Sequence, residues 1–347
     1  MSIAEVRGER RFIDVRNAIC PHPVTLIKDT LETLDEGVVL EALTDHRAAA
    51  LRTIPGFCRG GGYPFEVTEE KGVWRIIILN RQPGRPSPKV AVRGVRKSFG
   101  SRGGFLTVID RVDLDVEEGE FVCLVGPSGC GKSTLLNIVA GLETADSGEV
   151  EVGGKKVLGP GPDRVVIFQE PALFPWFNVR DNVAFGLRML NVEKKVRDEL
   201  VADYLKLVHL TRFSGALIHQ LSGGMKQRVA LARALAMNPE VLLMDEPFAA
   251  LDAQTKGLMQ KELQEICGQT KKTILFVTHD VHEAVRLGDQ VLVFSHLPGR
   301  IKRDFQIDRE EARRSEIPYF VRTAAAILEE LREEVEKAAR EEMEHAG

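Results

Sequence analysis

The stretch Gly126-Pro127-Ser128-Gly129-Cys130-Gly131-Lys132-Ser133-Thr134 decides the fold of most of this chain. The apolar run before it, residues 121–125, is typical of a buried strand, and the apolar residues after it predict a short helix that ends at Gly141. The glycines of the stretch carry no Cβ, so successive backbone N–H groups can point inward at an anion. The start of the helix adds a partial positive charge. The stretch therefore predicts a phosphate-binding loop.

The same residues fill every fixed position of the pattern G-x-x-x-x-G-K-[ST]. In that pattern Lys132 reaches the β- and γ-phosphates of a nucleotide, and Ser133 offers its hydroxyl to Mg²⁺. The alternative is a glycine-rich turn with a chance Lys-Ser pair, and the strand–loop–helix context argues against it. The sequence thus predicts a nucleoside triphosphate and Mg²⁺ as ligands.

Length, charge and cysteine content limit the remaining function classes. The chain has 347 residues, enough for about two domains. Its net charge of −4 at pH 7 provides no basic field that would favour nucleic acid or an anionic membrane as the main partner. We expect no secretory signal and no transmembrane segment, because neither apolar pattern occurs in the sequence. The five scattered cysteines contain no CxxC pair and predict a reducing cytoplasm without a disulfide framework or zinc site.

Residues 10–81 predict a small α/β unit in which strands and helices follow the order β-α-β-α-β-β. This order predicts a two-layer sandwich, a mixed sheet with both helices on one face. The expected strands are residues 11–15, 38–43, 65–68 and 73–79, and the expected helices are residues 24–34 and 47–54.

The candidate chemistry of this unit lies at Cys20-Pro21-His22-Pro23, where the first helix begins. Prolines are tolerated in a first helical turn, and a helix N-terminus favours the thiolate form of a cysteine. A buried capping cysteine without chemistry is the alternative. Among the other cysteines, Cys130 lies inside the phosphate loop, so we expect bound nucleotide to shield it.

The whole N-terminal segment resembles the TusA-like (SirA-like) sulfur-carrier family. The resemblance rests on Ile13-Asp14-Val15-Arg16, the Cys-Pro-x-Pro box, Thr44-Asp45, the run from Ile54 to Cys58, and the final Trp-x-Ile-x-Ile strand. In that family the cysteine of the box carries sulfur as a persulfide, so the resemblance gives Cys20 this role and implies a sulfurtransferase partner. Cys58 is interpreted as a core residue. Tyr63 stands where many relatives have histidine, which puts the family's partner docking in doubt.

A proline-rich segment follows this unit. Prolines at 83, 86 and 88 favour an extended chain, so residues 82–88 are expected to be a linker. We therefore divide the chain into a sulfur-carrier domain, 1–81, the linker, 82–88, a nucleotide-binding domain, 89–309, and an amphipathic helical tail, 310–347.

Further motifs follow the phosphate loop in the second domain. Ser222-Gly223-Gly224 opens a predicted helix, and the apolar run 241–244 is typical of a strand in a parallel sheet. That strand ends in Asp245-Glu246, a pair of carboxylates that is costly to bury unless a cation or a catalytic role retains it. A later predicted strand, 273–278, ends at His279.

Taken together from Phe99 to His279, these motifs occur in the order found in nucleotide-binding subunits of ABC transporters, and the chain resembles that family. The resemblance implies a P-loop NTPase ABC cassette with a RecA-like α/β core, an antiparallel β subdomain and a helical subdomain. It also implies ATP as the nucleotide, Mg²⁺ as the metal and ATP hydrolysis as the activity.

The resemblance also implies a role for each motif residue. Lys132 and the loop amides of residues 126–134 hold the phosphates, while Ser133, Gln169 and Asp245 arrange Mg²⁺. Gln169 also places the attacking water, Glu246 is the general base and His279 donates to the γ-phosphate. Phe99 stacks on adenine; a core phenylalanine is the alternative.

In the family, two cassettes form a head-to-tail homodimer. Ser222, Gly223 and Gly224 of one subunit close over ATP held by the other. Met225 replaces the commonest residue, glutamine, but we do not expect this to abolish closure, because the preceding hydroxyl and amides make the main contacts.

Three segments resemble the nitrate/sulfonate/taurine importer branch: Gly161-Pro162-Asp163-Arg164, Phe168 to Trp176, and Pro298-Gly299-Arg300-Ile301. The apolar stretch after Gln169 suits a cleft that receives a helix of a membrane permease. This branch implies permease subunits, an extracytoplasmic solute-binding protein acting indirectly, and a peripheral position on the cytoplasmic face of the membrane.

Two other functions stay open. A soluble ABC ATPase acting on DNA or ribosomes would usually bring coiled-coil insertions or tandem cassettes, which this sequence lacks. A soluble ABC ATPase that regulates or drives sulfur transfer through the Cys20 domain is the second alternative. Nitrate, a sulfonate, taurine, bicarbonate and an aromatic acid all remain candidate solutes, because the ATPase of such an importer does not touch its solute.

Overall fold

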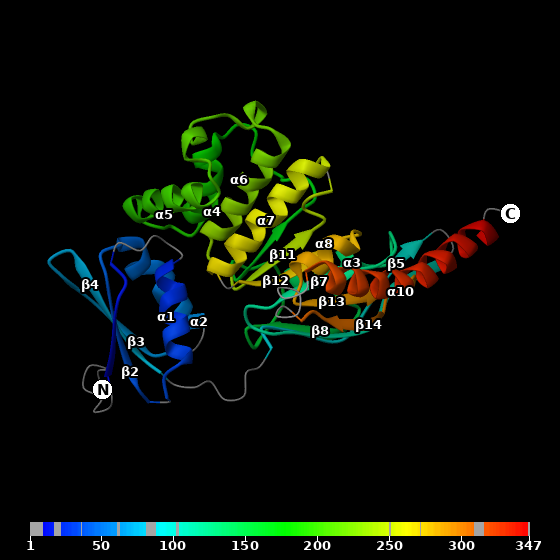
Figure 1. Ribbon diagram of the computed structural model, residues 1–347, viewed down its shortest axis with the longest axis horizontal. Helices are drawn as coiled ribbons and strands as arrows, with labels where there is room; N and C mark the ends of the chain where they lie inside the picture. The colour runs from blue at the N-terminus through cyan, green and yellow to red at the C-terminus, as the bar shows by residue number, and fades with distance from the viewer. Residues whose placement is uncertain are drawn as a thin grey trace. The chain divides into compact units, whose positions relative to one another are not determined.

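The computed structural model describes residues 10–16, 22–35, 37–60, 63–80, 88–101, 104–249, 251–270, 272–308 and 316–345. The chain forms two compact units. The first comprises Met1–Pro86, Ala172–Asn238 and Lys261–Lys271, and the second comprises Ser87–Pro171, Pro239–Gln260 and Lys272–Gly347. Figure 1 shows the elements of both units along the chain. Cys20 and residues 82–87 of the predicted linker lie outside the described residues.

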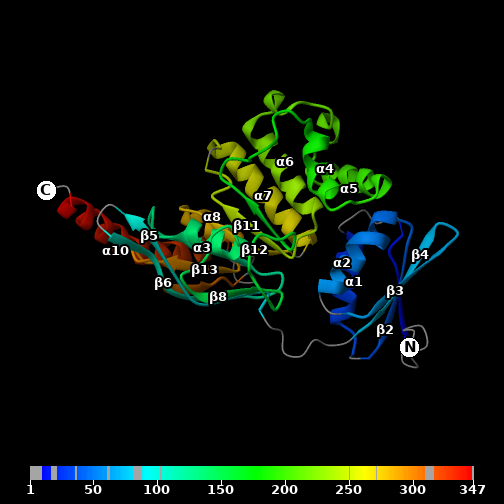
Figure 2. The same ribbon diagram turned by 180° about the vertical axis from the view of Figure 1, so that it is seen from behind.

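The N-terminal part of the first unit is a four-stranded mixed sheet in the order β1-β2-β4-β3. The strands are β1 (Arg10–Asp14), β2 (Val39–Thr44), β3 (Phe65–Glu70) and β4 (Val73–Leu79). β1 runs parallel to β2, whereas β4 is antiparallel to both β2 and β3. Helices α1 (His22–Glu32) and α2 (Ile54–Gly60) cover one face of this sheet (Figure 2). Their core contains Ile27 and Cys58 from the helices with Leu40, Ile76 and Ile78 from the strands, so the predicted two-layer sandwich is confirmed.

The second helical segment is longer than predicted. We expected it to end at Ile54, but it continues to Gly60 through a π-helical turn, η2 (Ala49–Thr53), and then α2. Pro55 is the second residue of α2, directly after the π-helical turn. The N–H of Ile54 donates to the carbonyl oxygen of Ala49, five residues back, so the helix is continuous there and contains a proline that has no N–H to donate.

The rest of the first unit is helical. It contains α4 (Val179–Met189), α5 (Lys194–Leu207), α6 (Gly223–Ala236), the turns η3 (Thr211–Phe213) and η4 (Ile218–Gln220), and the C-terminal part of α7 (Ala253–Thr270). α4 and α5 are separate helices because the chain turns between them at Asn191, which has a φ of +52°. Asn178 caps α4 by accepting a hydrogen bond from the N–H of Asp181 at 2.7 Å.

The second unit is built on a six-stranded sheet in the order β10-β11-β12-β7-β13-β14. The strands are β7 (Phe121–Val125), β10 (Arg164–Ile167), β11 (Val241–Asp245), β12 (Thr273–Val277), β13 (Gln290–Phe294) and β14 (Ile301–Gln306). Only the edge strand β14 is antiparallel to its neighbour. Every residue of β7, β12 and β13 is buried, as expected for strands covered on both faces.

A second, antiparallel sheet of this unit has the order β6-β5-β8-β9. It consists of β5 (Val90–Ser101), β6 (Gly104–Val116), β8 (Ser147–Val152) and β9 (Lys155–Lys156). Helix α3 (Lys132–Ala140) shares one hydrophobic core with both sheets: Leu135 and Leu136 pack in a cluster with Ile109 and Val150 from one sheet and Val122 from the other. The predicted cassette fold, with its antiparallel β subdomain, is confirmed.

Two further helices, α8 (Val281–Leu287) and α10 (Glu316–His345), complete the unit. The Phe320 ring of α10 stacks on His282 of α8 with ring centroids 5.6 Å apart. Lys302 of β14 forms ion pairs with Glu330, Glu333 and Glu334 of α10. Burial lowers the pKa of Lys302, but the three glutamates together outweigh it and raise the pKa. The tail therefore forms the predicted amphipathic helix and packs on the cassette.

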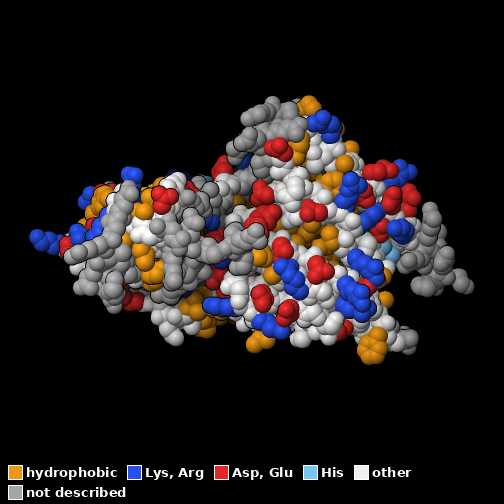
Figure 3. Space-filling view, turned by 90° about the horizontal axis from the view of Figure 1, so that it is seen from below, with side chains coloured by type: hydrophobic (Ala, Val, Ile, Leu, Met, Phe, Trp, Pro, Cys, Tyr) orange, Lys and Arg blue, Asp and Glu red, His pale blue; other side chains and the backbone are white. Residues whose placement is uncertain are grey.

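The surface of the described residues mixes charges of both signs. Figure 3 shows Lys and Arg side chains interspersed with Asp and Glu side chains over the face that it presents. Within the described ranges, no helix is both long and apolar enough to cross a bilayer.

Candidate functional site

The phosphate loop joins β7 to α3 and depends on glycine at two close approaches. Gly131 caps α3 with a φ of +102°, and a Cβ there would lie 2.9 Å from the carbonyl oxygen of Val108. A Cβ at Gly126 would lie 2.9 Å from the Cβ of Phe294 and 3.0 Å from the Sγ of Cys130. Real Cβ atoms do not approach other atoms so closely, so the loop requires glycine at both positions. Of the other loop residues, Ser128 and Gly129 are exposed and Thr134 is half-buried.

Lys132 closes this loop on itself. Its side chain is buried, and Nζ donates hydrogen bonds to the carbonyl oxygens of Gly126 at 2.9 Å and Pro127 at 2.7 Å. A buried ammonium is costly unless it is hydrogen-bonded, so these two carbonyls hold the amine inside the loop. The first residue of α3 thereby places a positive charge where the sequence predicts phosphate.

Cys130 is the cysteine of the phosphate loop. Its side chain is buried with no nucleotide needed to cover it, and burial raises the pKa of its thiol. The fold itself therefore shields the thiol, and further shielding by bound nucleotide stays a prediction.

Ser133 meets the end of a neighbouring strand. Its hydroxyl donates a hydrogen bond to Oδ1 of Asp245, the last residue of β11, at 2.9 Å. Burial raises the pKa of Asp245, although the bond from Ser133 opposes this, and the adjacent charge of Glu246 raises it further. A hydroxyl and a carboxylate oxygen fit the preference of Mg²⁺ for hard oxygen ligands. A nearby cation would also stabilise the charged form of the partly desolvated carboxylate.

The pair Glu246 and His279 lies at the ends of β11 and β12. Oε2 of Glu246 is 3.1 Å from Nδ1 of His279. Glu246 has a φ of +44°, in the left-handed region that costs a non-glycine residue energy, and its N–H donates to the carbonyl oxygen of Val277 at 2.9 Å. Such strain at a site of charged residues is typical of functional positions.

Gln169 belongs to the same edge of the sheet. It follows β10 by two residues, and Ile167 of β10 is paired with Met244 of β11, so Gln169 lies beyond the same carboxyl ends as Asp245. Its side chain is exposed. Within the described residues, no cluster of three or more His, Cys, Asp and Glu could hold a metal ion. Mg²⁺ does not require one, because it commonly binds one or two carboxylates with water and phosphate oxygens.

Phe99 lies on β5 with 39% of its surface exposed. The Nζ of Lys97 is 5.0 Å from the centroid of its ring. The alternative of a core phenylalanine is therefore wrong, and stacking on adenine stays a prediction.

Ser222 caps α6 in the first unit. Its Oγ accepts a hydrogen bond from the N–H of Met225 at 3.3 Å, and Gly223 is the first residue of the helix. The cap uses the backbone of residue 225, so methionine serves as well as glutamine there. Ser222 and Gly223 are exposed, whereas Gly224 is buried.

One residue that braces the loop was not predicted. A Cβ at Gly299 would lie 2.0 Å from the carbonyl oxygen of Cys130, and the N–H of Gly299 donates to the carbonyl oxygen of Val108 at 2.8 Å. The N–H of Asp110 in turn donates to the carbonyl oxygen of Gly299 at 3.1 Å. The sequence offered only a Pro-Gly motif, which we interpreted as a mark of the importer branch.

A lysine that closes a glycine-rich loop beside a strand ending in carboxylates defines a P-loop nucleotide-binding ATPase. Residues 109–249 match the family described as ABC transporter, and residues 11–80 match the family described as Sulfurtransferase TusA. The chain belongs to the ABC transporter ATP-binding family, whose members are ATPases, and it carries an N-terminal TusA domain.

Several relatives are similar over the cassette. An uncharacterised ABC transporter ATP-binding protein of Methanocaldococcus jannaschii is 47% identical over 73% of this chain and 95% of the relative. The taurine import ATP-binding protein of Burkholderia thailandensis is 45% identical over 72% of this chain and 99% of the relative. The nitrate import ATP-binding protein of a Synechocystis species is 48% identical over 62% of this chain and 82% of the relative. A dimeric ABC cassette in a post-hydrolysis state with ADP and Pi has a TM-score of 0.57 and 32% identity, covering 63% of this chain and 99% of that one.

Replacing Gly131 should damage the loop before any chemistry occurs. Gly131→Ala combines an unfavourable φ with the contact to Val108, so we expect a loss of about 1–3 kcal/mol in the free energy of unfolding and weaker ATP binding. Thermal unfolding and calorimetric titration with ATP measure the two effects. Gly257→Ala in α7 is the matched control, because a Cβ there meets nothing within 4 Å. An unchanged melting temperature for Gly131→Ala would contradict the loop geometry.

Proposed function

We propose that this chain is the ATP-hydrolysing subunit of an ABC importer and powers solute uptake through a membrane permease. The contact of Ser133 with Asp245, beside the pair Glu246 and His279, is the observation that carries the ATPase part. The relatives named for nitrate and taurine import support the importer part. Co-purification of the chain with a hydrophobic permease separates this function from that of a soluble ABC ATPase.

Each residue at the carboxyl edge of the sheet has a role in this proposal. The ammonium of Lys132 and the loop amides bind the β- and γ-phosphates, and Phe99 stacks on the adenine ring. Ser133, Asp245 and Gln169 would hold Mg²⁺, which would neutralise phosphate charge when bound. Glu246 accepts the proton of the attacking water, and His279 donates a hydrogen bond to the γ-phosphate. Glu246 lies within reach of His279, which orients it.

Two copies of the chain complete each site. Ser222 and Gly223 are exposed at the start of α6, where a helix terminus favours an anion. We propose that this segment, with Gly224, closes over ATP bound to the partner cassette in a head-to-tail homodimer. The dimeric arrangement of the similar solved cassette supports this assembly.

The permease would dock on the aromatic segment that precedes α4. Trp176 is 70% exposed and lies beside Phe174, with ring centroids 5.6 Å apart. Phe174 packs against Phe185 at 4.4 Å and is covered by the guanidinium of Arg233 at 5.5 Å, so the segment is a rigid aromatic platform. An exposed aromatic patch on a packed base is typical of an interaction site. In this proposal the cassette lies on the cytoplasmic face of the membrane, and an extracytoplasmic solute-binding protein contributes indirectly.

The N-terminal domain adds a second candidate function, sulfur transfer. Its match to the TusA family supports a persulfide role for Cys20 and a sulfurtransferase partner. A sulfur-containing solute would connect this role with import. We also propose the domain boundaries 1–81, 82–88, 89–309 and 310–347.

Glu246→Gln tests the hydrolytic assignment. The amide keeps the shape of the side chain but cannot accept the proton, so ATP turnover should fall by at least roughly 100-fold while ATP binding survives. Steady-state ATPase assays and analytical ultracentrifugation with ATP should show an inactive, accumulating dimer. Glu117→Gln, an exposed change of the same chemistry, serves as the control. Undiminished turnover in Glu246→Gln would exclude Glu246 as the base.

The sulfur-carrier role predicts selective loading of Cys20. After incubation with a sulfurtransferase and its donor, mass spectrometry should find an adduct of about 32 Da, one sulfur atom, on Cys20. The adduct should be absent from Cys20→Ser. Cys58, Cys123 and Cys130 are buried and serve as internal controls. Equal labelling of all cysteines, or none at Cys20, would leave the domain as a docking or regulatory module.

A further inference from the structure

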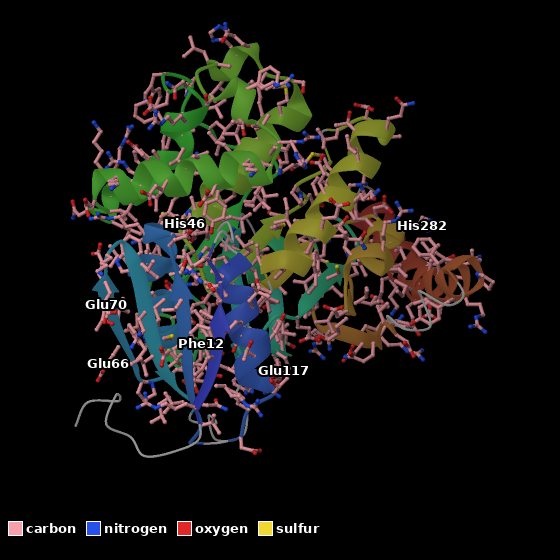
Figure 4. All side chains as sticks on the ribbon, turned by 60° about the vertical axis from the view of Figure 1, so that its left-hand side comes forward. Phe12, His46, Glu66, Glu70, Glu117 and His282 are labelled. Atoms are coloured by element: carbon pink, nitrogen blue, oxygen red, sulfur yellow. The ribbon has the colours of Figure 1, made fainter. Side chains whose placement is uncertain are left out.

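The N-terminal domain is joined to the helical part of the first unit by two charged pairs. Nη2 of Arg47 lies 2.8 Å from Oε2 of Glu193, the N-cap residue of α5. Nε2 of His46 lies 2.9 Å from Oδ2 of Asp203, near the C-terminal end of α5. In Figure 4, His46 lies at the end of the N-terminal domain that faces the green helices. Both pairs therefore join the residues at the start of the helical segment that leads into α2 to the same helix, α5.

The backbone fixes the orientation of the His46 ring. The N–H of His46 donates to Oγ1 of Thr44 at 3.1 Å, and Nδ1 accepts a hydrogen bond from the N–H of Ala49 at 3.3 Å. In the neutral ring Nδ1 is the acceptor and the hydrogen is on Nε2, the atom that faces Asp203. Protonation adds a hydrogen at Nδ1, so the charged ring gives up the bond from Ala49 and keeps the contact with Asp203. Only 20% of the His46 side chain and 14% of the Asp203 side chain are exposed, so solvent screens this pair less than a surface pair.

A third contact lies at the end of α6. A Cβ at Gly56 of α2 would lie 3.0 Å from the side-chain Nδ2 of Asn238, so the Asn238 side chain lies close to the backbone of α2 there. Asn238 has a φ of +52° and follows the last residue of α6, Ala236, by two positions. The helix that ends beside the N-terminal domain is the one that Ser222 begins.

We propose that His46, Arg47 and Gly56 form a docking surface for α5 and α6 of the same chain, through which the N-terminal domain controls the position of the Ser222 segment. The partner of this surface is the acidic side of α5, Glu193, Glu199 and Asp203. The regulatory step rests on the proposed role of Ser222 in closing the ATP site. The docking itself does not depend on that role.

The charges around His46 make docking sensitive to pH. Asp203 and Glu199 face it from α5, and Asp45 and Arg47 flank it in its own segment. The close contact with the Asp203 carboxylate raises the pKa of His46, and the charges of Glu199 and Asp45 add to this effect, whereas burial opposes it. A raised pKa in the docked state means that protonation favours docking. Docking is therefore strongest below the undocked pKa, about 6.5, and weakens as pH rises through the raised value.

An NMR titration of the full chain with labelled histidines tests the docking. The His46 signal is assigned with His46→Gln, and no nucleotide is needed. Asp203→Asn should lower the pKa of His46 by at least about half a unit, because it removes the partner charge. Asp198→Asn is the matched control on the same helix, since Asp198 pairs with Arg180 at 2.9 Å instead. A His46 pKa that does not respond to Asp203→Asn would overturn the docking and leave the ATPase proposal intact.

Charge reversal tests the regulatory step. Arg47→Glu and Glu193→Arg should each raise hydrogen exchange in α5 and change the ATPase rate by at least about twofold, and the double variant should restore both. Equal exchange in all four proteins would overturn the docking. A second outcome separates the two claims. If the single variants raise hydrogen exchange and the double variant restores it, but the ATPase rate is the same in all four proteins, the docking stands and the control of the Ser222 segment is overturned.

Discussion

The buried ammonium of Lys132 is the contact on which the second unit depends. Its two hydrogen bonds to the carbonyl oxygens of Gly126 and Pro127 keep a positive charge inside a loop with no space for side chains at Gly126 or Gly131. Gly299 packs against the carbonyl oxygen of Cys130, and the carbonyl oxygen of Val108 packs against Gly131. Both β6 and the segment before β14 therefore determine the shape of the loop. The parallel strands β11 and β12 then end beside it, which brings Asp245, Glu246 and His279 to one edge.

The electrostatics of that edge favour a bound cation. Asp245 and Glu246 are adjacent carboxylates, and burial together with their mutual repulsion raises the pKa of Asp245. Glu246 is also held in a left-handed backbone conformation. These costs, of about 1–3 kcal/mol for the backbone alone, persist where function requires them. A divalent ion beside Ser133 would offset the charge repulsion between the two carboxylates.

Local patterns predicted the parts that depend on neighbouring residues. The spacing of the phosphate loop, the apolar strands on either side of it, the N-terminal β-α-β-α-β-β order and the Ser222 cap each lie within a short stretch. Contacts between distant residues could not be predicted in this way: Gly299 against Cys130, the burial of the Cys130 thiol, and the pairing of Arg47 with Glu193 across 146 positions. The helix through Pro55 was missed because a proline ordinarily indicates the end of a helix, and the π-turn before it has no strong sequence signal.

Manganese binding, followed by electron paramagnetic resonance in the presence of ATP, tests most directly whether Ser133 and Asp245 form the metal-assisted phosphate site. Mn²⁺ prefers the same oxygen ligands as Mg²⁺ and gives a signal that distinguishes free from bound ion. We predict that Ser133→Ala and Asp245→Asn each weaken Mn²⁺ binding to the ATP complex by at least about tenfold, whereas Asp115→Asn on β6 leaves it unchanged. Equal Mn²⁺ affinity in all four proteins would contradict it.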